Sequence, residues 1–312
     1  MSASAEQAAH PEHHAHPDHP DHIPARLWWV LAGLTFAWGF NWTAMKLALS
    51  EVSPFTFRAM CLGVGSAVLF AVMKAGGHSL VVPKGQRRRL IGFALVAITA
   101  WNLLVAYGVS MIPSGRAAML AYTMPAWAIP LSVWVLGERL NGRKITGLAL
   151  GMAGLALLLG EGVHDLGSAP IGSLLVLCAA LMWALATVFQ KRYPVSMPVG
   201  SYTAWIMLIG GIPIFLGALA FDDLGALAQV SGKAWFGVLY NVFIAFAWAH
   251  WAWITLATSL SVTVFSLAML LTPLIGVLSG ILFLGEQPSA VEYAAFALVI
   301  ASLLTVALPA RK

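Results

Sequence analysis

The chain has 312 residues, of which 60% are hydrophobic and only 9% are charged. An average soluble domain has roughly 25% charged and roughly 45–50% apolar residues, so this composition excludes an ordinary soluble domain. The formal net charge is +5, from 17 basic and 12 acidic residues, and its distribution along the chain is more informative than its sum.

The first segment, residues 1–26, is polar and holds six histidines between residues 10 and 22. Such a segment cannot bury enough apolar surface to fold, so we predict a disordered cytoplasmic tail. Neutral imidazoles and carboxylates also bind ions such as Zn²⁺, and a metal-collecting tail is therefore the alternative interpretation.

Ten apolar stretches follow, each long enough to cross a hydrocarbon core about 30 Å thick as a helix. They are residues 27–49, 53–74, 90–111, 116–136, 144–160, 171–192, 201–221, 234–257, 260–284 and 290–308. In lipid every backbone polar group must be satisfied within its own segment, which requires helices. The sequence therefore predicts an all-α integral membrane protein with ten transmembrane helices.

The basic residues indicate how these helices are oriented. With a cytoplasmic N-terminus, ten crossings place 13 Lys and Arg residues on the cytoplasmic side and four on the other. This is a strong positive-inside bias, so the basic balance reports topology rather than nucleic-acid binding. We predict a multi-pass protein of a bacterial cytoplasmic (inner) membrane with both termini in the cytoplasm.

The chain also repeats itself at an offset close to 148 residues. Matching pairs are Pro125 with Pro273, Gly137-Glu138 with Gly285-Glu286, and Trp38 with Trp183. Five spans per half is an odd number, so two such halves cross the membrane in opposite senses. We therefore predict two inverted repeats, residues 27–160 and 171–308, which enclose a central cavity as transporters do.

Ten helices in two halves, with a proline and then Gly-Glu in the fourth and ninth spans, resemble the EamA-type families of the drug/metabolite transporter superfamily. Within it the chain is most similar to bacterial exporters of aromatic amino acids of the YddG type. The resemblance covers about residues 27–308. It implies a cavity lined by spans one to four and six to nine, with spans five and ten at the periphery.

Polar side chains deep in the spans are the first candidates for a substrate site. At 1.5 Å rise per residue, Asn41 lies about 4–5 Å from the membrane midplane, Asn102 about 2 Å and His250 about 7 Å. Groups this deep need a partner in the bundle or a water-filled cavity. Asn102 and His250 match under the repeat, so we expect a substrate clamp, with interhelical hydrogen bonds as the alternative.

Aromatic side chains are the second group of candidates. Trp38, Asn41 and Trp42 are spaced i, i+3 and i+4, so they share one helix face. The other rings expected in the same wall are Trp101, Tyr107, Tyr122, Trp183 and Trp251. Flat rings suit an aromatic side chain by stacking, or a cation over the ring face. Tight helix packing is the alternative.

The remaining candidates concern bends and helix ends. Pro125 and Pro273 lie near the centres of their spans, where a missing backbone donor predicts kinks that shape the cavity and serve as hinges. Ser266 is expected to satisfy freed backbone groups or to touch substrate. Glu138 and Glu286 are expected to cap helices, with Glu286 at the start of span 290–308. Lys46 is expected to extend to the interfacial water.

The function predicted from these features is secondary or facilitative export of small metabolites, namely amino acids, with aromatic or large apolar side chains favoured. The alternative is a metal-ion or organic-cation transporter that uses the histidine tail and an aromatic cavity. The spans carry no mid-membrane carboxylate, so either His250 couples protons or transport is facilitative. We predict no enzymatic activity, catalytic residue, metal centre or cofactor, and no nucleic-acid or obligate protein partner besides substrate and lipid.

Overall fold

The computed structural model describes residues 25–137, 142–162, 169–259, 269 and 271–307. These residues form helices and turns, and no strand occurs among them. In chain order the helices are α1 (Ala25–Leu49), α2 (Pro54–Ala75), η1 (Lys84–Gln86), α3 (Arg87–Phe93), η2 (Ala94–Ala100), α4 (Trp101–Met111), α5 (Ser114–Ala121), α6 (Met124–Leu136), α7 (Gly142–Gly162), α8 (Ala169–Arg192), α9 (Val199–Phe221), η3 (Leu224–Gln229), α10 (Gly232–Leu239), η4 (Tyr240–Trp248), α11 (Ala249–Ser259), α13 (Leu271–Leu284) and α14 (Ala290–Ala307). The short η1 and η3 are 3-10 helices, whereas η2 and η4 are π-helices.

Helix length and composition support a membrane protein. Six runs in the described part are long and apolar enough to span a bilayer, namely Pro54–Ala75, Lys84–Met111, Ser114–Leu136, Pro170–Arg192, Val199–Phe221 and Gly232–Leu256. Three predicted spans hold shorter apolar helices, over Ile145–Leu157, Leu271–Leu284 and Ala290–Thr305. The remaining span is α1, whose 25 residues include the polar Asn41 and Lys46. The all-α membrane fold is thus confirmed, whereas ten crossings stays a prediction.

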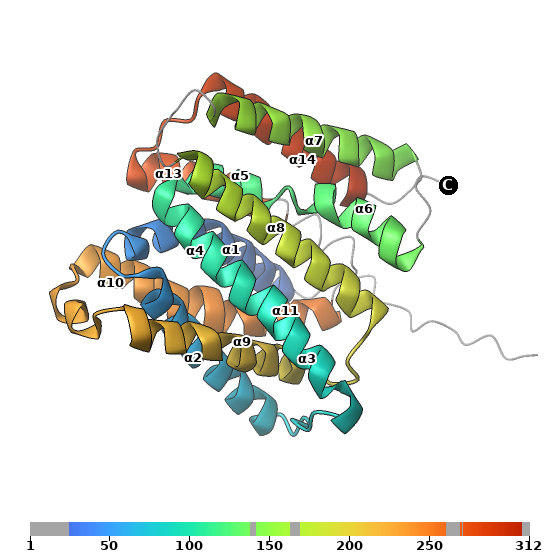
Figure 1. Ribbon diagram of the computed structural model, residues 1–312, viewed down its shortest axis with the longest axis vertical. Helices are drawn as coiled ribbons and strands as arrows, with labels where there is room; N and C mark the ends of the chain where they lie inside the picture. The colour runs from blue at the N-terminus through green and yellow to red at the C-terminus, as the bar shows by residue number, and fades with distance from the viewer. Residues whose placement is uncertain (1–24, 138–141, 163–168, 260–268, 270, 308–312) are drawn as a thin grey trace, which may run out of the picture.

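The helices pack mostly across the two halves of the chain (Figure 1). Helix α2 lies against α9, and α8 lies against both α4 and α6. Helix α1 packs on α13 and along the continuous run of α10, η4 and α11. At one edge of the molecule α7 and α14 pack chiefly on each other. This edge pair lies where the family resemblance places the peripheral fifth and tenth spans.

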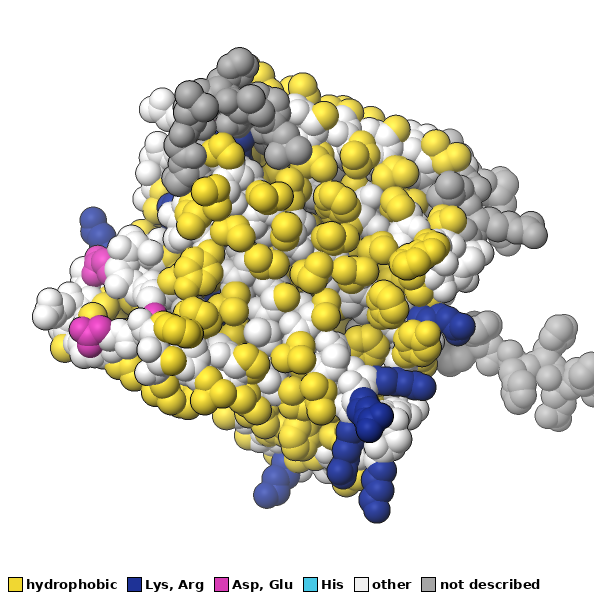
Figure 2. Space-filling view, viewed as in Figure 1, with side chains coloured by type: hydrophobic (Ala, Val, Ile, Leu, Met, Phe, Trp, Pro, Cys, Tyr) yellow, Lys and Arg dark blue, Asp and Glu magenta, His cyan; other side chains and the backbone are white. Residues whose placement is uncertain are grey.

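The surface separates into an apolar band and two polar ends. Figure 2 shows hydrophobic side chains across the middle, with basic side chains gathered at one end and acidic ones at the other. On α9, Phe215, Leu216 and Leu219 are each more than half exposed, which suits contact with lipid rather than water. We call the end with the turns at residues 76–83 and 193–198 the basic end. The opposite end, with turns at residues 50–53, 112–113, 222–231 and 285–289, is the capped end.

The two halves share backbone details at matching places. Gly137 and Gly285, which follow α6 and α13, both adopt left-handed φ angles, of 66° and 67°. This conformation ends a helix and favours glycine, which accounts for the glycine of each Gly-Glu pair. The π-helices η2 and η4 also lie at corresponding positions in the two halves.

Acidic side chains cap helices at the capped end. Asp222, directly after α9, accepts hydrogen bonds in Oδ2 from the Thr56 backbone N–H at 3.0 Å and the Thr56 hydroxyl at 2.6 Å. The Ser53 hydroxyl donates to the same oxygen. A carboxylate at a helix N-terminus satisfies free N–H groups and complements the helix dipole. Asp222 therefore ties the start of α2, in the first half, to the end of α9, in the second.

Glu51 makes a similar link in the opposite direction. Its carboxylate accepts hydrogen bonds from the Ser231 backbone N–H and the Ser231 hydroxyl, both at 2.6 Å. Ser231 is the N-cap of α10. These donors favour the ionised form and lower the pKa of Glu51 below its ordinary value of 4.5.

This link predicts an acid-sensitive contribution to stability. Because the pKa of Glu51 is lower in the folded state, its contribution is present above the unfolded pKa and is lost as the pH falls through the folded pKa. We expect Glu51→Gln to lower Tm at pH 7, and the difference in Tm from wild type to shrink as the pH falls below the ordinary value of 4.5 and through the lowered folded pKa. Thermal unfolding across this pH range measures the gap. In a Ser231→Ala background the effect of Glu51→Gln should shrink but not vanish, because the backbone N–H of residue 231 still donates to the carboxylate. A gap that does not narrow as the pH falls would refute the assignment.

Candidate transport site

The polar aromatic face of α1 divides between two environments. Trp38 is half-buried, and its indole Nε1 donates to the carbonyl of Ala245 in η4 at 3.2 Å. Trp42 is buried in the main apolar core. Asn41 lies between them with its amide oxygen Oδ1 buried and without a hydrogen-bond partner among the described residues. An unpaired buried acceptor is costly, so Asn41 is the member of this face that is suited to a donor from a ligand.

Asn102 and His250 occupy equivalent places, each two residues after a π-helix. The Asn102 amide donates to the carbonyl of Ile98 at 2.9 Å, and His250 Nδ1 lies 2.8 Å from the carbonyl of Phe246. Each side chain therefore bonds to its own helix rather than across to the other. With Nδ1–H donating, a neutral His250 ring leaves Nε2 as an acceptor. The amide of Asn102 is buried.

The His250 ring belongs to a row of rings between α1 and η4. Its centroid lies 5.9 Å from the ring of Trp38, edge to face, and 5.4 Å from that of Phe246. These separations are those of favourable aromatic contacts. π-helical turns occur often at functional sites, and η4 supplies both Phe246 and the carbonyl that holds Trp38.

A second ring pair joins the two halves through α4 and α8. The rings of Trp101 and Trp183 lie 5.0 Å apart at an angle of 53°. Trp183 is 41% exposed and Trp251 is 38% exposed, so these two rings are more open to the surroundings than a closed cavity wall would be.

The two predicted tyrosines lie apart from each other. Tyr107 packs edge-on against Phe55 near the capped end, with ring centroids 6.0 Å apart. Tyr122 ends α5, and its hydroxyl interacts with that of Thr272 in α13. Tyr122 therefore joins the fourth and ninth spans close to the two predicted prolines.

Pro125 lies at a helix start. The helical run of the fourth span breaks at Tyr122–Thr123, and Pro125 is in the first turn of α6. Proline is well tolerated in a first turn because its missing N–H would be unpaired there anyway. The bend at Pro125 is thus a break with a new helix start, rather than a kink within one continuous helix. Pro273 lies in α13 and is buried, and the kink expected there stays a prediction.

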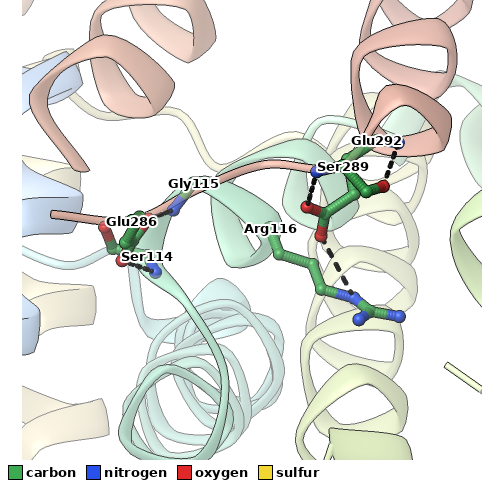
Figure 3. A network of polar contacts seen from close by, with 6 residues as sticks. All are labelled: Ser114, Gly115, Arg116, Glu286, Ser289 and Glu292. Atoms are coloured by element: carbon green, nitrogen blue, oxygen red, sulfur yellow. Dashed lines mark hydrogen bonds and ion pairs between the residues drawn. The ribbon is translucent and has the colours of Figure 1, made fainter. Parts of the chain in front are cut away.

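Glu286 caps a different helix from the one expected. Its carboxylate accepts the backbone N–H of Ser114 at 2.6 Å and that of Gly115 at 2.9 Å, at the start of α5 (Figure 3). The expectation that it serves the start of span 290–308 is wrong. Glu286 instead fastens the α13–α14 turn of the second half to the fourth span of the first half.

Glu292, rather than Glu286, caps the N-terminus of α14. Its side chain accepts the Ser289 N–H at 3.1 Å and its own N–H donates to the Ser289 hydroxyl at 3.0 Å, the reciprocal pattern of a capping box. Arg116 of α5 also lies 3.9 Å from Glu292 (Figure 3). The two glutamates thus hold α5 and α14 together at the capped end.

Two predicted residues, Glu138 and Ser266, lie outside the described residues. A cavity of about 720 Å³ opens at the basic end, where its described lining comes from Val135, Leu136 and Gly137 after α6 and from Lys191 and Arg192 at the end of α8. The predicted aromatic residues are not part of that described lining. The ring row near η4 and this cavity are therefore separate features of the described structure.

Two basic residues make contacts that the sequence did not predict. Lys46 is partly exposed, and its Nζ donates to the carbonyls of Val109, Ser110 and Ile112 at 2.8, 3.1 and 2.8 Å. It thereby caps the C-terminus of α4, where a cation complements the helix dipole. Arg58 of α2 is 2% exposed, although it is one of the four basic residues that the topology places on the non-cytoplasmic side. Its position inside an apolar run was the available signal.

Comparison with known proteins agrees with this architecture. A solved crystal structure superposes with a TM-score of 0.64 at 21% identity over 90% of this chain and 96% of that one, which supports the fold. The chain is 26% identical to the uncharacterized transporter YoaV of Bacillus subtilis, covering 82% of this chain and 88% of that protein. It is 24% identical to a probable amino-acid metabolite efflux pump of Escherichia coli, covering 85% and 89%. The model of the EamA-like transporter family matches residues 27–160 and again 170–308. The chain therefore belongs to the EamA-like transporter family.

Proposed function

We propose that this membrane transporter exports amino acids, with aromatic and large apolar side chains favoured, by alternating access of two inverted repeats. The observation that carries the proposal is the row of rings formed by Trp38, His250 and Phe246 between the first and eighth spans. Such rings can stack on an aromatic side chain. A relative named as a probable amino-acid metabolite efflux pump supports the same substrate class.

The matched features of the two halves support inverted repeats. A π-helix interrupts the third and the eighth span, and a left-handed glycine ends the helix before each Gly-Glu pair. Inverted repeats bind substrate where they meet and move against each other to open either side. Asn41, with its unpaired acceptor oxygen, would take the substrate ammonium group.

The distribution of basic residues and helix caps supports an orientation of the protein in the membrane. If both termini are cytoplasmic, the basic end faces the cytoplasm and the capped end faces outward. Asp222, Glu51 and Glu286 fasten helix starts at the capped end, whereas the 720 Å³ cavity lies at the basic end. We infer that the capped end is the closed side of the transport path.

The proposal is tested by amino-acid flux from proteoliposomes, with and without a pH gradient. Radiolabelled phenylalanine, tryptophan, threonine and methionine should be compared, and we expect the aromatic pair to move fastest. If none of the four moves, the substrate class is wrong. A dependence of flux on the pH gradient would assign proton coupling, for which His250 is the candidate group, and its absence would indicate facilitated transport.

The Trp101–Trp183 contact predicts a measurable loss of flux. If the Trp101 ring also stacks on the substrate, a contact worth about 0.5–1.5 kcal/mol is lost in Trp101→Ala, and the initial flux of phenylalanine should fall about 2- to 10-fold. Trp134 of α6 is 79% exposed and provides the matched control, because Trp134→Ala should leave flux near the wild-type value. Equal flux in both variants would remove Trp101 from the substrate path.

The alternative of a metal or organic-cation transporter depends on the histidine tail, which lies outside the described residues. Among the residues that are described, no group of three or more His, Cys, Asp or Glu side chains is placed to hold a metal ion. We expect deletion of residues 1–22 to leave amino-acid flux unchanged. A loss of flux, or metal-dependent transport that disappears with the tail, would favour the alternative.

A further inference from the structure

Arg58 is a buried cation whose charge is not matched by any described residue. It lies in the second turn of α2 and is 2% exposed. Its Nη2 donates to the Met45 sulfur at 2.8 Å, and its Nε has no hydrogen-bond partner among the residues that the structure describes. Within the part of the chain that the structure describes, no carboxylate lies at ion-pair distance from it.

This arrangement is unfavourable without a further partner. A guanidinium offers five N–H donors in a fixed fork, whereas a thioether sulfur is only a weak acceptor. The remaining contacts are to the faces of Phe57 and Phe246, whose ring centroids lie 5.0 and 5.7 Å from the guanidinium carbon. Cation–π contacts offset only part of the cost of burying an unpaired charge. The described residues around Arg58 therefore supply no anion for its charge.

The surroundings of Arg58 point to the chemistry of that anion. Phe246 contacts both Arg58 and the His250 ring, and the His250 ring contacts Trp38. Arg58 therefore stands at one end of the ring row. Met45 lies on the α1 face that carries Trp38, and its flexible side chain can yield the Arg58 donor to a stronger acceptor.

We propose that Arg58 binds the carboxylate of the transported amino acid while the ring row receives its side chain. This proposal rests on the proposed function and adds a specificity-determining residue to it. The fork of the guanidinium matches both oxygens of a carboxylate, and pairing in a water-poor site makes such a contact strong. Substrates would then require a free carboxylate, so amines and amides of the same side chain would be poor ligands.

The test compares an amino acid with its amide in wild type and variants. The probes are phenylalanine and phenylalaninamide, or the corresponding pair for whichever amino acid the flux assay finds fastest, with Kd measured on purified protein in detergent. Wild type should bind the acid about 10- to 100-fold more tightly than the amide. Arg58→Met should reduce this ratio towards one, and Arg58→Lys should retain part of it. Arg88→Met removes an exposed charge of the same kind and should keep the wild-type ratio.

Each outcome decides the proposal. If wild type binds the acid and the amide equally well, the proposal is overturned. This result needs no variant, so it decides the question even if Arg58→Met does not fold. An unchanged ratio in folded Arg58→Met, checked by size exclusion, overturns it as well. If wild type transports amino acids but does not discriminate the acid from the amide, the proposed function stands and the proposed role of Arg58 is refuted. If wild type binds no amino acid at all, the proposed function fails and the role of Arg58 fails with it.

Discussion

Replacing Gly237 by alanine is expected to prevent stable packing of α10 on α1. A Cβ atom at residue 237 would lie 2.4 Å from the carbonyl oxygen of Ala44 and 2.6 Å from the backbone nitrogen of Ala48. Both are backbone atoms of a neighbouring helix, so neither can rotate away. Forcing such an overlap costs about 3 kcal/mol, and the contact joins the first span to the eighth. Thermal unfolding monitored by size-exclusion chromatography in detergent should show a large drop in Tm and in folded yield.

Gly63 of α2 provides the matched control for this prediction. It is also a helical glycine, but a Cβ there would meet nothing within 4 Å. Gly63→Ala should therefore leave Tm unchanged or raise it slightly, because alanine favours the helix. Equal Tm values for the two alanine variants would contradict the close approach of α10 to α1.

Removing the carboxylate of Glu286 is expected to have the second largest effect. Glu286→Ala leaves the N–H groups of Ser114 and Gly115 without their acceptor and removes an anion from the start of α5. Charge-assisted bonds of this kind contribute about 1.5–3 kcal/mol, so Tm should fall clearly. Because Glu286 also ties the two halves together at the capped end, transport should change along with stability.

A graded series separates the charge of Glu286 from its hydrogen bonds. Glu286→Gln keeps one carbonyl acceptor and loses the negative charge, so it should fall between wild type and Glu286→Ala in Tm. Measurements in low and high salt show how much of the effect is electrostatic, since exposed charges are screened. A wild-type Tm for Glu286→Ala would show that α5 is held by packing alone.

The large elements of the fold could be predicted because hydrophobic length is a strong signal. The six spans such as Pro54–Ala75 follow directly from long apolar runs, and the breaks near Gly137 and Gly285 follow from glycine at helix ends. The bend of the fourth span was expected from Pro125, but the break lies at Tyr122–Thr123. Proline cannot donate to the carbonyl four residues back, here Ala121, and its ring crowds that carbonyl, so the interruption precedes the proline.

The details of the candidate site could not be predicted for a different reason. Periodicity shows which residues share a face, but not which distant helix the face meets. Glu286 lies 172 residues from Ser114, and nothing local distinguishes α5 from α14 as its partner. Asn102 and His250 each follow a π-helix and hydrogen-bond to their own helix, and the substrate clamp expected from the pair stays a prediction. Arg58 was missed because its depth depends on the tertiary packing around α2.

The most direct test of the account asks whether one position on α1 is reached from each side of the membrane in turn. Cys61 and Cys178 are first replaced by alanine, and Asn41→Cys then places a single thiol on the proposed path. Leu216→Cys on α9, 57% exposed in the apolar band, is the lipid-facing control. The account predicts that a membrane-impermeant thiol reagent modifies the thiol at residue 41 from either side, that substrate slows this, and that the control stays unmodified. Modification from neither side, or from one side only whatever the substrate, would contradict it.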